Sequence, residues 1–210
     1  DSSPRNELDN VAPLTAYAKS KIGTELELKK LSIDNHSAST KFTSLRFATA
    51  CGASPRLRLD LVLNDFVATA ISTSKIQVLS DGSPWRPLID VYDMSKALYW
   101  ASIRKKGENN EVINTGSNDW NYQISELANS VAKMVSNDVP VNLNKNAQPD
   151  KRSYKVCFDK FNDIASKEFL PEITLEKSVE QLINQIKDID KNVLLKERDH
   201  MIRLKVLKYL

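Results

Sequence analysis

The chain has 210 residues, enough for one large domain or two small ones, and its 41% hydrophobic and 27% charged residues are typical of a globular protein. Its net charge is +3 and its basic residues are spread along the sequence, so charge gives no argument for nucleic-acid binding. No apolar run approaches the roughly 20 residues that span a bilayer. Two distant cysteines, Cys51 and Cys157, and the lack of a targeting pattern lead us to expect a cytoplasmic protein with reduced thiols.

The hydrophobic pattern predicts helices and strands that alternate along the chain. After a polar segment over residues 1–13, apolar residues at three- and four-residue intervals predict a helix over 14–31. The further elements, in chain order, are a strand over 41–48, a helix over 59–72, a strand over 75–79, an extended segment over 87–91, a helix that Asp93 caps and that ends near 104, a strand over 111–114, a helix over 123–135, a strand over 154–158, a helix from 159, and a helix that Thr174 caps and that ends near 189. This alternation is typical of an α/β protein.

Glycine is scarce in this sequence, with five residues where an average usage near 7% would give about 15. No two of these glycines are closer than nine positions; they are Gly23, Gly52, Gly82, Gly107 and Gly116. A dinucleotide-binding G-x-G-x-x-G turn and a P-loop both need glycines within a few residues of one another. The chain therefore contains neither of these phosphate-binding loops.

Tyr17 and Lys21 stand four residues apart on the first predicted helix. Side chains at this spacing share a helix face, with Cβ atoms about 5–6 Å apart. An ammonium held there stabilises tyrosinate, which favours general acid/base catalysis by the phenol. The spacing alone is weak support, because lysine is abundant here and a second such pair, Tyr92 and Lys96, occurs. Taken alone, Tyr17 is better interpreted as a partly buried structural tyrosine.

Five motifs in order give this pair a context. They are PLTAYAKSK (13–21), LRFATACG (45–52), DLVLNDFV (60–67), DGSPWRPLIDVYD (81–93) and NTG (114–116). Together they resemble the extended short-chain dehydrogenase/reductases, specifically the NAD-dependent nucleotide-sugar epimerase/dehydratase family. The resemblance covers about residues 1–190. It implies an α/β fold: the C-terminal part of a Rossmann-like doubly wound parallel sheet, with a small mixed α/β substrate-binding domain.

The resemblance also implies roles for residues near the cofactor, which is NAD or NADP in this family. Tyr17 is similar to the family's catalytic base, which takes a proton from a sugar hydroxyl. Lys21 is similar to the lysine that lowers the pKa of that tyrosine and holds the nicotinamide ribose. Phe47 and Ala48 lie where the backbone of family members borders the nicotinamide.

Further residues match positions that bind the nucleotide-sugar substrate. Asn64 matches an asparagine that contacts the diphosphate, and Arg86 matches an arginine that clamps it. Arg152 resembles a second such clamp, and Arg58 is a further candidate from a neighbouring loop. Thr49 stands where many members have Asn, and we expect it to contact the sugar or phosphate. At Asp90 many members have His, a difference that we expect to affect loop hydrogen bonding rather than the reaction.

The resemblance divides the chain into three parts. Residues 1–75 correspond to the C-terminal part of the NAD-binding Rossmann domain, 76–190 mainly to the nucleotide-sugar-binding domain with a Rossmann strand near 112–115, and 191–210 to a charged helical tail. Only sixteen residues precede Tyr17, whereas family members place a glycine-rich turn, a ribose-binding acidic residue and a catalytic Ser/Thr upstream of it. We therefore expect the chain to correspond to the C-terminal portion of such an enzyme.

Three functional interpretations stay open at this point. The first is a nucleotide-sugar epimerase, dehydratase or reductase that uses NAD and forms a homodimer through the helix of Tyr17. Its working form would include the N-terminal half of the family's fold, and these 210 residues alone are expected neither to bind NAD well nor to be active. The second is a module that binds nucleotide sugars without redox chemistry, and the third is an inactive remnant. We expect no metal, nucleic-acid or membrane partner.

Overall fold

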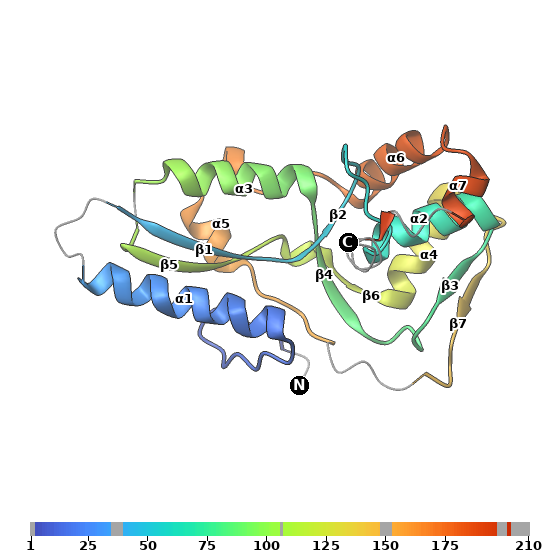
Figure 1. Ribbon diagram of the computed structural model, residues 1–210. Helices are drawn as coiled ribbons and strands as arrows, with labels where there is room; N and C mark the ends of the chain where they lie inside the picture. Colours follow the sequence, from blue (N-terminus) through green and yellow to red (C-terminus); the bar gives the residue numbers. More distant parts are fainter. Residues whose placement is uncertain (1–2, 35–39, 106, 148–152, 197–200, 203–210) are drawn as a thin grey trace.

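The computed structural model describes residues 3–34, 40–105, 107–147, 153–196 and 201–202. One part of the fold is a parallel strand pair covered by helices. In it, β1 (Phe42–Phe47) pairs with β5 (Asn110–Thr115) in parallel. Helix α1 (Ala16–Asp34) lies on one face of this pair and α3 (Val91–Ile103) on the other (Figure 1). These elements confirm the predicted α/β class.

The other part contains two further small sheets. β4 (Trp85–Asp90) lies between β2 (Thr49–Cys51), which is parallel to it, and β6 (Asn121–Gln123), which is antiparallel. β3 (Ile76–Val78) pairs in parallel with β7 (Val141–Leu143). The sequence predicted β3, within 75–79, but not β2, β6 or β7, which lack an apolar run such as KIQVL.

A helical cluster packs against these short strands. It consists of α2 (Val62–Thr73), α4 (Ile124–Val135), α6 (Leu175–Ile186) and the short α7 (Lys191–Lys196). Leu175, Val179, Leu182 and Ile186 recur at helical spacing on α6, and all four are buried. The hydroxyl of Thr174 accepts a hydrogen bond from the amide of Lys177, which confirms the predicted cap. The remaining elements are α5 (Asp159–Ile164), η1 (Asn118–Trp120) and η2 (Lys167–Phe169).

The helix cap predicted at Asp93 is wrong by three residues. Asp90, the last residue of β4, is the N-cap of α3, and its Oδ1 accepts from the amide of Tyr92 at 2.9 Å. Its Oδ2 accepts from the Ser178 hydroxyl of α6 at 2.6 Å. Asp90 also fills the space beside Gly52, whose φ of +102° and lack of a Cβ are both required there. Asp90 therefore joins β2, β4, α3 and α6, as expected for a role in hydrogen bonding.

Asp93 has a different function from the predicted one. Its carboxylate accepts from the amides of Glu172 and Ile173 at 3.1–3.2 Å and so holds the segment that leads into α6. Burial raises the pKa of Asp93 above its ordinary value, against the opposing effect of these amides and of Lys96.

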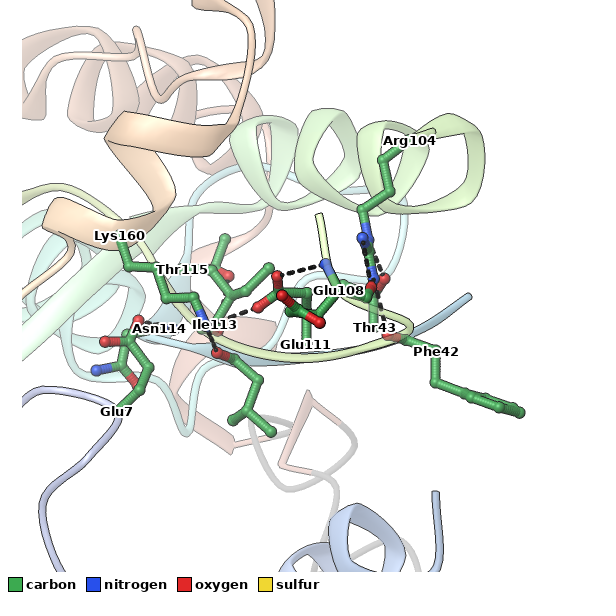
Figure 2. A network of polar contacts seen from close by, with 11 residues as sticks. Glu7, Phe42, Thr43, Arg104, Glu108, Glu111, Ile113, Asn114, Thr115 and Lys160 are labelled. Atoms are coloured by element: carbon green, nitrogen blue, oxygen red, sulfur yellow. Dashed lines mark hydrogen bonds and ion pairs between the residues drawn. The ribbon is translucent and has the colours of Figure 1, made fainter. Parts of the chain in front are cut away.

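A polar network runs along the β1–β5 pair (Figure 2). Arg104, just after α3, donates to Thr43 Oγ1 at 2.6 Å and to the carbonyl of Phe42 at 2.9 Å. Lys160 of α5 lies 2.7 Å from a carboxylate oxygen of Glu111 and donates to the carbonyl of Val112 at 2.9 Å. Burial opposes the charged form of Glu111, but the contacts with Lys160, Glu108 and Arg104 outweigh it and lower the pKa of Glu111.

Residues 154–158 do not form the predicted strand but an extended segment with one isolated bridge, from Arg5 to Val156. Asn121 makes two hydrogen bonds of 2.9 Å with the backbone of Val156. The amide of Cys157 donates to the carbonyl of Arg5 at 2.8 Å. The segment thus joins the N-terminal residues to β6.

The Ser178–Asp90 contact gives the first prediction. Replacing Ser178 with alanine leaves a buried carboxylate oxygen without its hydroxyl donor, so the free energy of unfolding is expected to fall by about 1–3 kcal/mol in urea denaturation. Ser102, whose hydroxyl bonds only its own helix at the surface, is the matched control, and Ser102→Ala is expected to stay within about 0.5 kcal/mol. Equal effects of the two substitutions would contradict this structural role of Asp90.

Candidate functional site

Two clefts open where β1 passes into β2, with only Ala48 between the strands. The first cleft has a volume of ≈ 850 Å³ and is lined by Tyr17, Lys21, Phe47 and Ala48 among others. The second, of ≈ 700 Å³, is lined by Thr49 and Arg86 among others. The structure therefore groups the predicted cofactor residues in one cleft and two of the predicted substrate residues in a neighbouring one.

The Tyr17–Lys21 pair is at the beginning of α1. The Thr15 hydroxyl accepts from the amide of Ala18 at 3.1 Å, which places Tyr17 in the first turn of the helix. Lys21 Nζ lies 5.4 Å from the centre of the Tyr17 ring. The Tyr17 side chain is 72% exposed, so the phenol is in contact with solvent across the mouth of the cleft.

An ion pair positions α1 against β1. Arg46 donates from Nε and Nη2 to the two carboxylate oxygens of Glu25, at 2.9 and 2.6 Å. The hydrogen bond from Arg46 to Glu25 raises the pKa of Arg46, against the effect of its partial burial. Both residues line the first cleft. This bidentate contact sets the distance between the Tyr17 helix and the end of β1.

Close packing fixes the backbone at the end of β1. The amide of Ala48 donates to the carbonyl of Thr115 at 3.0 Å. The residue after Thr115, Gly116, leaves room for the buried Phe158 ring, which a Cβ at this position would approach to 2.7 Å. The predicted nicotinamide-side residues Phe47 and Ala48 therefore rest on a rigid support.

In the second cleft, the arginines differ in position. Arg86, on β4, lines the cleft and donates from Nη1 to the carbonyl of Trp85 at 2.9 Å. Arg58 makes a bidentate contact with Asp60, at 3.0 and 2.6 Å, and only Asp60 of this pair lines the cleft. The hydrogen bond with Asp60 raises the pKa of Arg58, against the effect of its partial burial. Arg58 is therefore linked to the second cleft through Asp60.

Asn64 lies behind the second cleft rather than in it. Its side chain is 1% exposed, and Oδ1 accepts from the amide of Gly52 at 2.9 Å. Its Nδ2 donates to the carbonyls of Arg58 and Gly52, at 3.0 and 3.3 Å. In this conformation Asn64 shapes the loop between β2 and α2, and a contact with a diphosphate stays a prediction.

Tyr154, which the sequence analysis did not select, lines both clefts. Its backbone amide lies 3.5 Å from the carbonyl of Trp85, and the neighbouring Ser153 hydroxyl accepts from the Trp85 amide at 3.0 Å. Lys155 Nζ lies 3.9 Å from the centre of the Trp85 ring. In the sequence, Tyr154 follows Arg152 by two residues, in the stretch DKRSY (150–154). Arg152 was selected as a candidate diphosphate ligand and is outside the described residues.

The second Tyr–Lys pair is committed to packing. Lys96 Nζ lies 5.9 Å from the centre of the Tyr92 ring, a geometry similar to that of the first pair. However, it also lies 3.1 Å from Glu172 and donates to the carbonyl of Leu170 at 3.0 Å. These contacts give Lys96 a structural role in holding the segment that leads into α6.

Burial accounts for the state of Cys51. It raises the pKa of the Cys51 thiol, to which the Asp90 charge adds, so the thiol stays protonated at neutral pH. Among the described residues, no three His, Cys, Asp or Glu side chains group as metal ligands. Within the same ranges, no helix has both the length and the apolar character required to cross a membrane.

Known proteins resemble this chain in sequence and in fold. The NAD-dependent epimerase/dehydratase family matches residues 1–116. UDP-N-acetylglucosamine 4-epimerase from Methanobrevibacter ruminantium M1, in complex with UDP-N-acetylmuramic acid, is similar with a TM-score of 0.70 and 22% identity over 87% of this chain and 58% of that one. UDP-glucuronic acid 4-epimerase from Bacillus cereus, in complex with UDP-glucuronic acid and NAD, has a TM-score of 0.71 and 20% identity over 90% and 58% of the two chains.

A third solved structure, UDP-glucose 4-epimerase of Thermus thermophilus in complex with NAD, has a TM-score of 0.67 and 16% identity over 90% of this chain and 59% of that one. At these identities the likeness shows the fold, a Rossmann-type α/β architecture. The chain spans a little under three fifths of the length of these three proteins.

The position of Asn64 gives the second prediction. Asn64→Ala removes the partners of the Gly52 amide and of two loop carbonyls, so unfolding free energy is expected to fall by about 2–3 kcal/mol and the Gly52 amide to exchange faster in hydrogen-exchange measurements. Asn129→Ala, at an exposed position of α4, is the control and is expected to change neither quantity. Unchanged exchange at Gly52 would show that Asn64 does not order this loop.

Proposed function

Because the chain belongs to the NAD-dependent epimerase/dehydratase family, we propose that its two clefts receive a nucleotide sugar and the nicotinamide end of NAD or NADP. The observation that carries this proposal is the segregation of Tyr17 and Lys21 into one cleft and Arg86 into the neighbouring one. The clefts share Tyr154 and adjoin at the Ala48–Thr49 peptide. A ligand with a reactive sugar and a charged diphosphate needs two such environments side by side.

In this proposal Tyr17 is the base of a nucleotide-sugar epimerase or dehydratase. The ammonium of Lys21 lies 5.4 Å from the centre of the Tyr17 ring, beside the proposed base. Tyr17, acting as the base, accepts the proton of a sugar hydroxyl, and Lys21 reaches the nicotinamide ribose. NAD, when bound, would supply the acceptor for the hydride that leaves the sugar carbon bearing this hydroxyl.

The first cleft offers chemical groups suited to the nicotinamide end of the cofactor. They are the phenol of Tyr17, the ammonium of Lys21 and the backbone at the end of β1. A Rossmann fold binds the cofactor pyrophosphate with a glycine-rich turn, and the five glycines of this sequence are too widely spaced to form one. These residues therefore account for one end of the cofactor only.

The second cleft is proposed to hold the diphosphate and nucleoside. Arg86 offers a planar guanidinium at its wall, a group suited to phosphate oxygens. Thr49 and Tyr154 are placed for contacts with the sugar, and Arg58 and Arg152 are proposed as further diphosphate ligands. In terms of domains, residues 1–75 are assigned to the cofactor side and 76–190 mainly to the substrate side, with 191–210 as a charged tail.

A second candidate function is binding of nucleotide sugars without turnover. The 72% exposure of Tyr17 favours it, since a general base is most effective in a site from which water is excluded. Substrate recognition by Arg86 and Tyr154 requires neither a shielded base nor a glycine-rich turn.

Helix α1 is the proposed homodimer contact. It exposes several large apolar side chains, namely Leu26, Leu31 and Ile33, although it packs on β1 and β5 with its other face. Pairing of two such helices would cover these side chains. The cytoplasm is the proposed compartment, in keeping with the unpaired Cys51 and Cys157.

Substrate binding gives the third prediction, measured with the 210-residue chain. Calorimetric titration with UDP-glucose is expected to show binding, and Arg86→Ala is expected to weaken it by roughly 10- to 100-fold through loss of a charge-assisted contact. Arg56→Ala, at an exposed position outside both clefts, is the control and is expected to bind normally. Normal binding by the Arg86 variant would refute the assignment of the second cleft.

Catalysis gives the fourth prediction, which separates the two candidate functions. With NAD present, Tyr17→Phe is expected to reduce conversion of UDP-sugars by about 10²–10⁴-fold while leaving UDP-glucose affinity unchanged. Tyr92→Phe, in the second Tyr–Lys pair, is the matched control and is expected to retain turnover. UDP-glucose binding without turnover in the unaltered chain would favour the binding module instead.

A further inference from the structure

We propose that the C-terminal strap, defined as residues 191–196 and 201–202, is a positioning element for one wall of the second cleft. This inference rests on the proposed function, because it concerns how that cleft is kept in shape for a nucleoside diphosphate. The strap lies beyond residues 1–116, which match the family, and also beyond the 1–190 span of the motif resemblance.

The strap is anchored by apolar packing on α2. Helix α7 begins with the amide of Leu194 bonded to the carbonyl of Asp190 at 3.1 Å and lies against α2 (Figure 1). The side chain of Leu194 is only 1% exposed, whereas that of its neighbour Leu195 is 50% exposed. Leu194 and Leu59 belong to the largest apolar cluster among the described residues, and the partly buried Met201 packs against it.

The strap also makes a backbone contact with the loop that precedes α2. The amide of Leu59 donates to the carbonyl of Met201 at 3.1 Å. Leu59 is itself buried and lines the second cleft, as do the next two residues, Asp60 and Leu61. The strap therefore contacts directly the residues that form the cleft wall.

Hydrogen bonds from three parts of the fold hold this loop. Asn64 of α2 bonds the backbone of Gly52 and Arg58, Gln185 of α6 bonds the backbone of Ser54, and Met201 of the C-terminal strap bonds Leu59. The loop between β2 and α2 contains no helix or strand, so its order depends on such contacts. The Arg58–Asp60 ion pair is part of the same loop. A strap that holds the loop therefore also positions these two charged side chains beside the cleft.

The consequence is that loss of strap packing should weaken binding of a diphosphate without direct contact between strap and ligand. Ordering a loosened loop upon binding consumes part of the interaction free energy. A residue that served only general stability would instead leave the affinity of the folded molecules unchanged. The strap thus consists of positioning residues, separate from those that touch the ligand.

The test compares Leu194→Ala with Leu195→Ala in the full chain, using UDP as the calorimetric ligand. Leu194→Ala is expected to raise the Kd for UDP by about tenfold, and Leu195→Ala to leave it within about twofold. The conservative Leu194→Met is expected to restore the affinity. Met201→Ala, at a partly buried position, is a milder second variant for use if Leu194→Ala does not fold.

Hydrogen exchange provides a readout that does not depend on any ligand. The Leu59 amide is expected to exchange faster in Leu194→Ala or Met201→Ala, while the Leu182 amide in α6 keeps its protection. Unchanged exchange at Leu59 would overturn the coupling between strap and loop. If the unaltered chain failed to bind UDP, the proposed function would be refuted, whereas the exchange result would still decide whether the strap orders the loop.

Discussion

The carboxylate of Asp90 is the constraint on which the arrangement of this molecule depends. It ends the central strand β4, caps α3, receives the hydroxyl of Ser178 from α6 and occupies the space that Gly52 leaves open. Because α3 covers the β1–β5 pair and α6 belongs to the helical cluster, one buried side chain connects both parts of the fold. The two clefts lie where these parts meet, so their relative position follows from this contact.

Much of the fold could be predicted because its longer elements carry clear periodicity. The Tyr17 helix, the β1 and β5 strands and α6 with its Thr174 cap were all predicted from apolar spacing and capping chemistry. The cap of α3 was misplaced because Asp90 and Asp93 are both suitable capping residues, and only the tertiary position of α6 distinguishes them. The strands β2, β6 and β7 and the 153–158 segment depend on partners distant in sequence, which no local pattern reveals.

The candidate site shows the same limit at the level of side chains. Tyr17 and Tyr92 each have a lysine four residues later, with similar distances from the ammonium to the ring. They differ in what else the lysine contacts, since Lys96 bonds Glu172 and the carbonyl of Leu170 on another segment. Motif order selected the Tyr17 pair, and its catalytic role stays a prediction. It did not reveal that Tyr154 lines both clefts, because that depends on how Ser153 and Lys155 hold Trp85.

The hydrogen bonds between Arg5 and the 153–158 segment have a consequence for how the protein folds. They join residues about 150 positions apart, so a large loop must close before they can form. Contacts of such high sequence separation are entropically costly and slow to appear, unlike the local helices. Tyr154 belongs to this segment, and the first cleft also contains Arg5. The wall between the two clefts is therefore assembled late, after the helices and the parallel strand pair have provided the surface on which it rests.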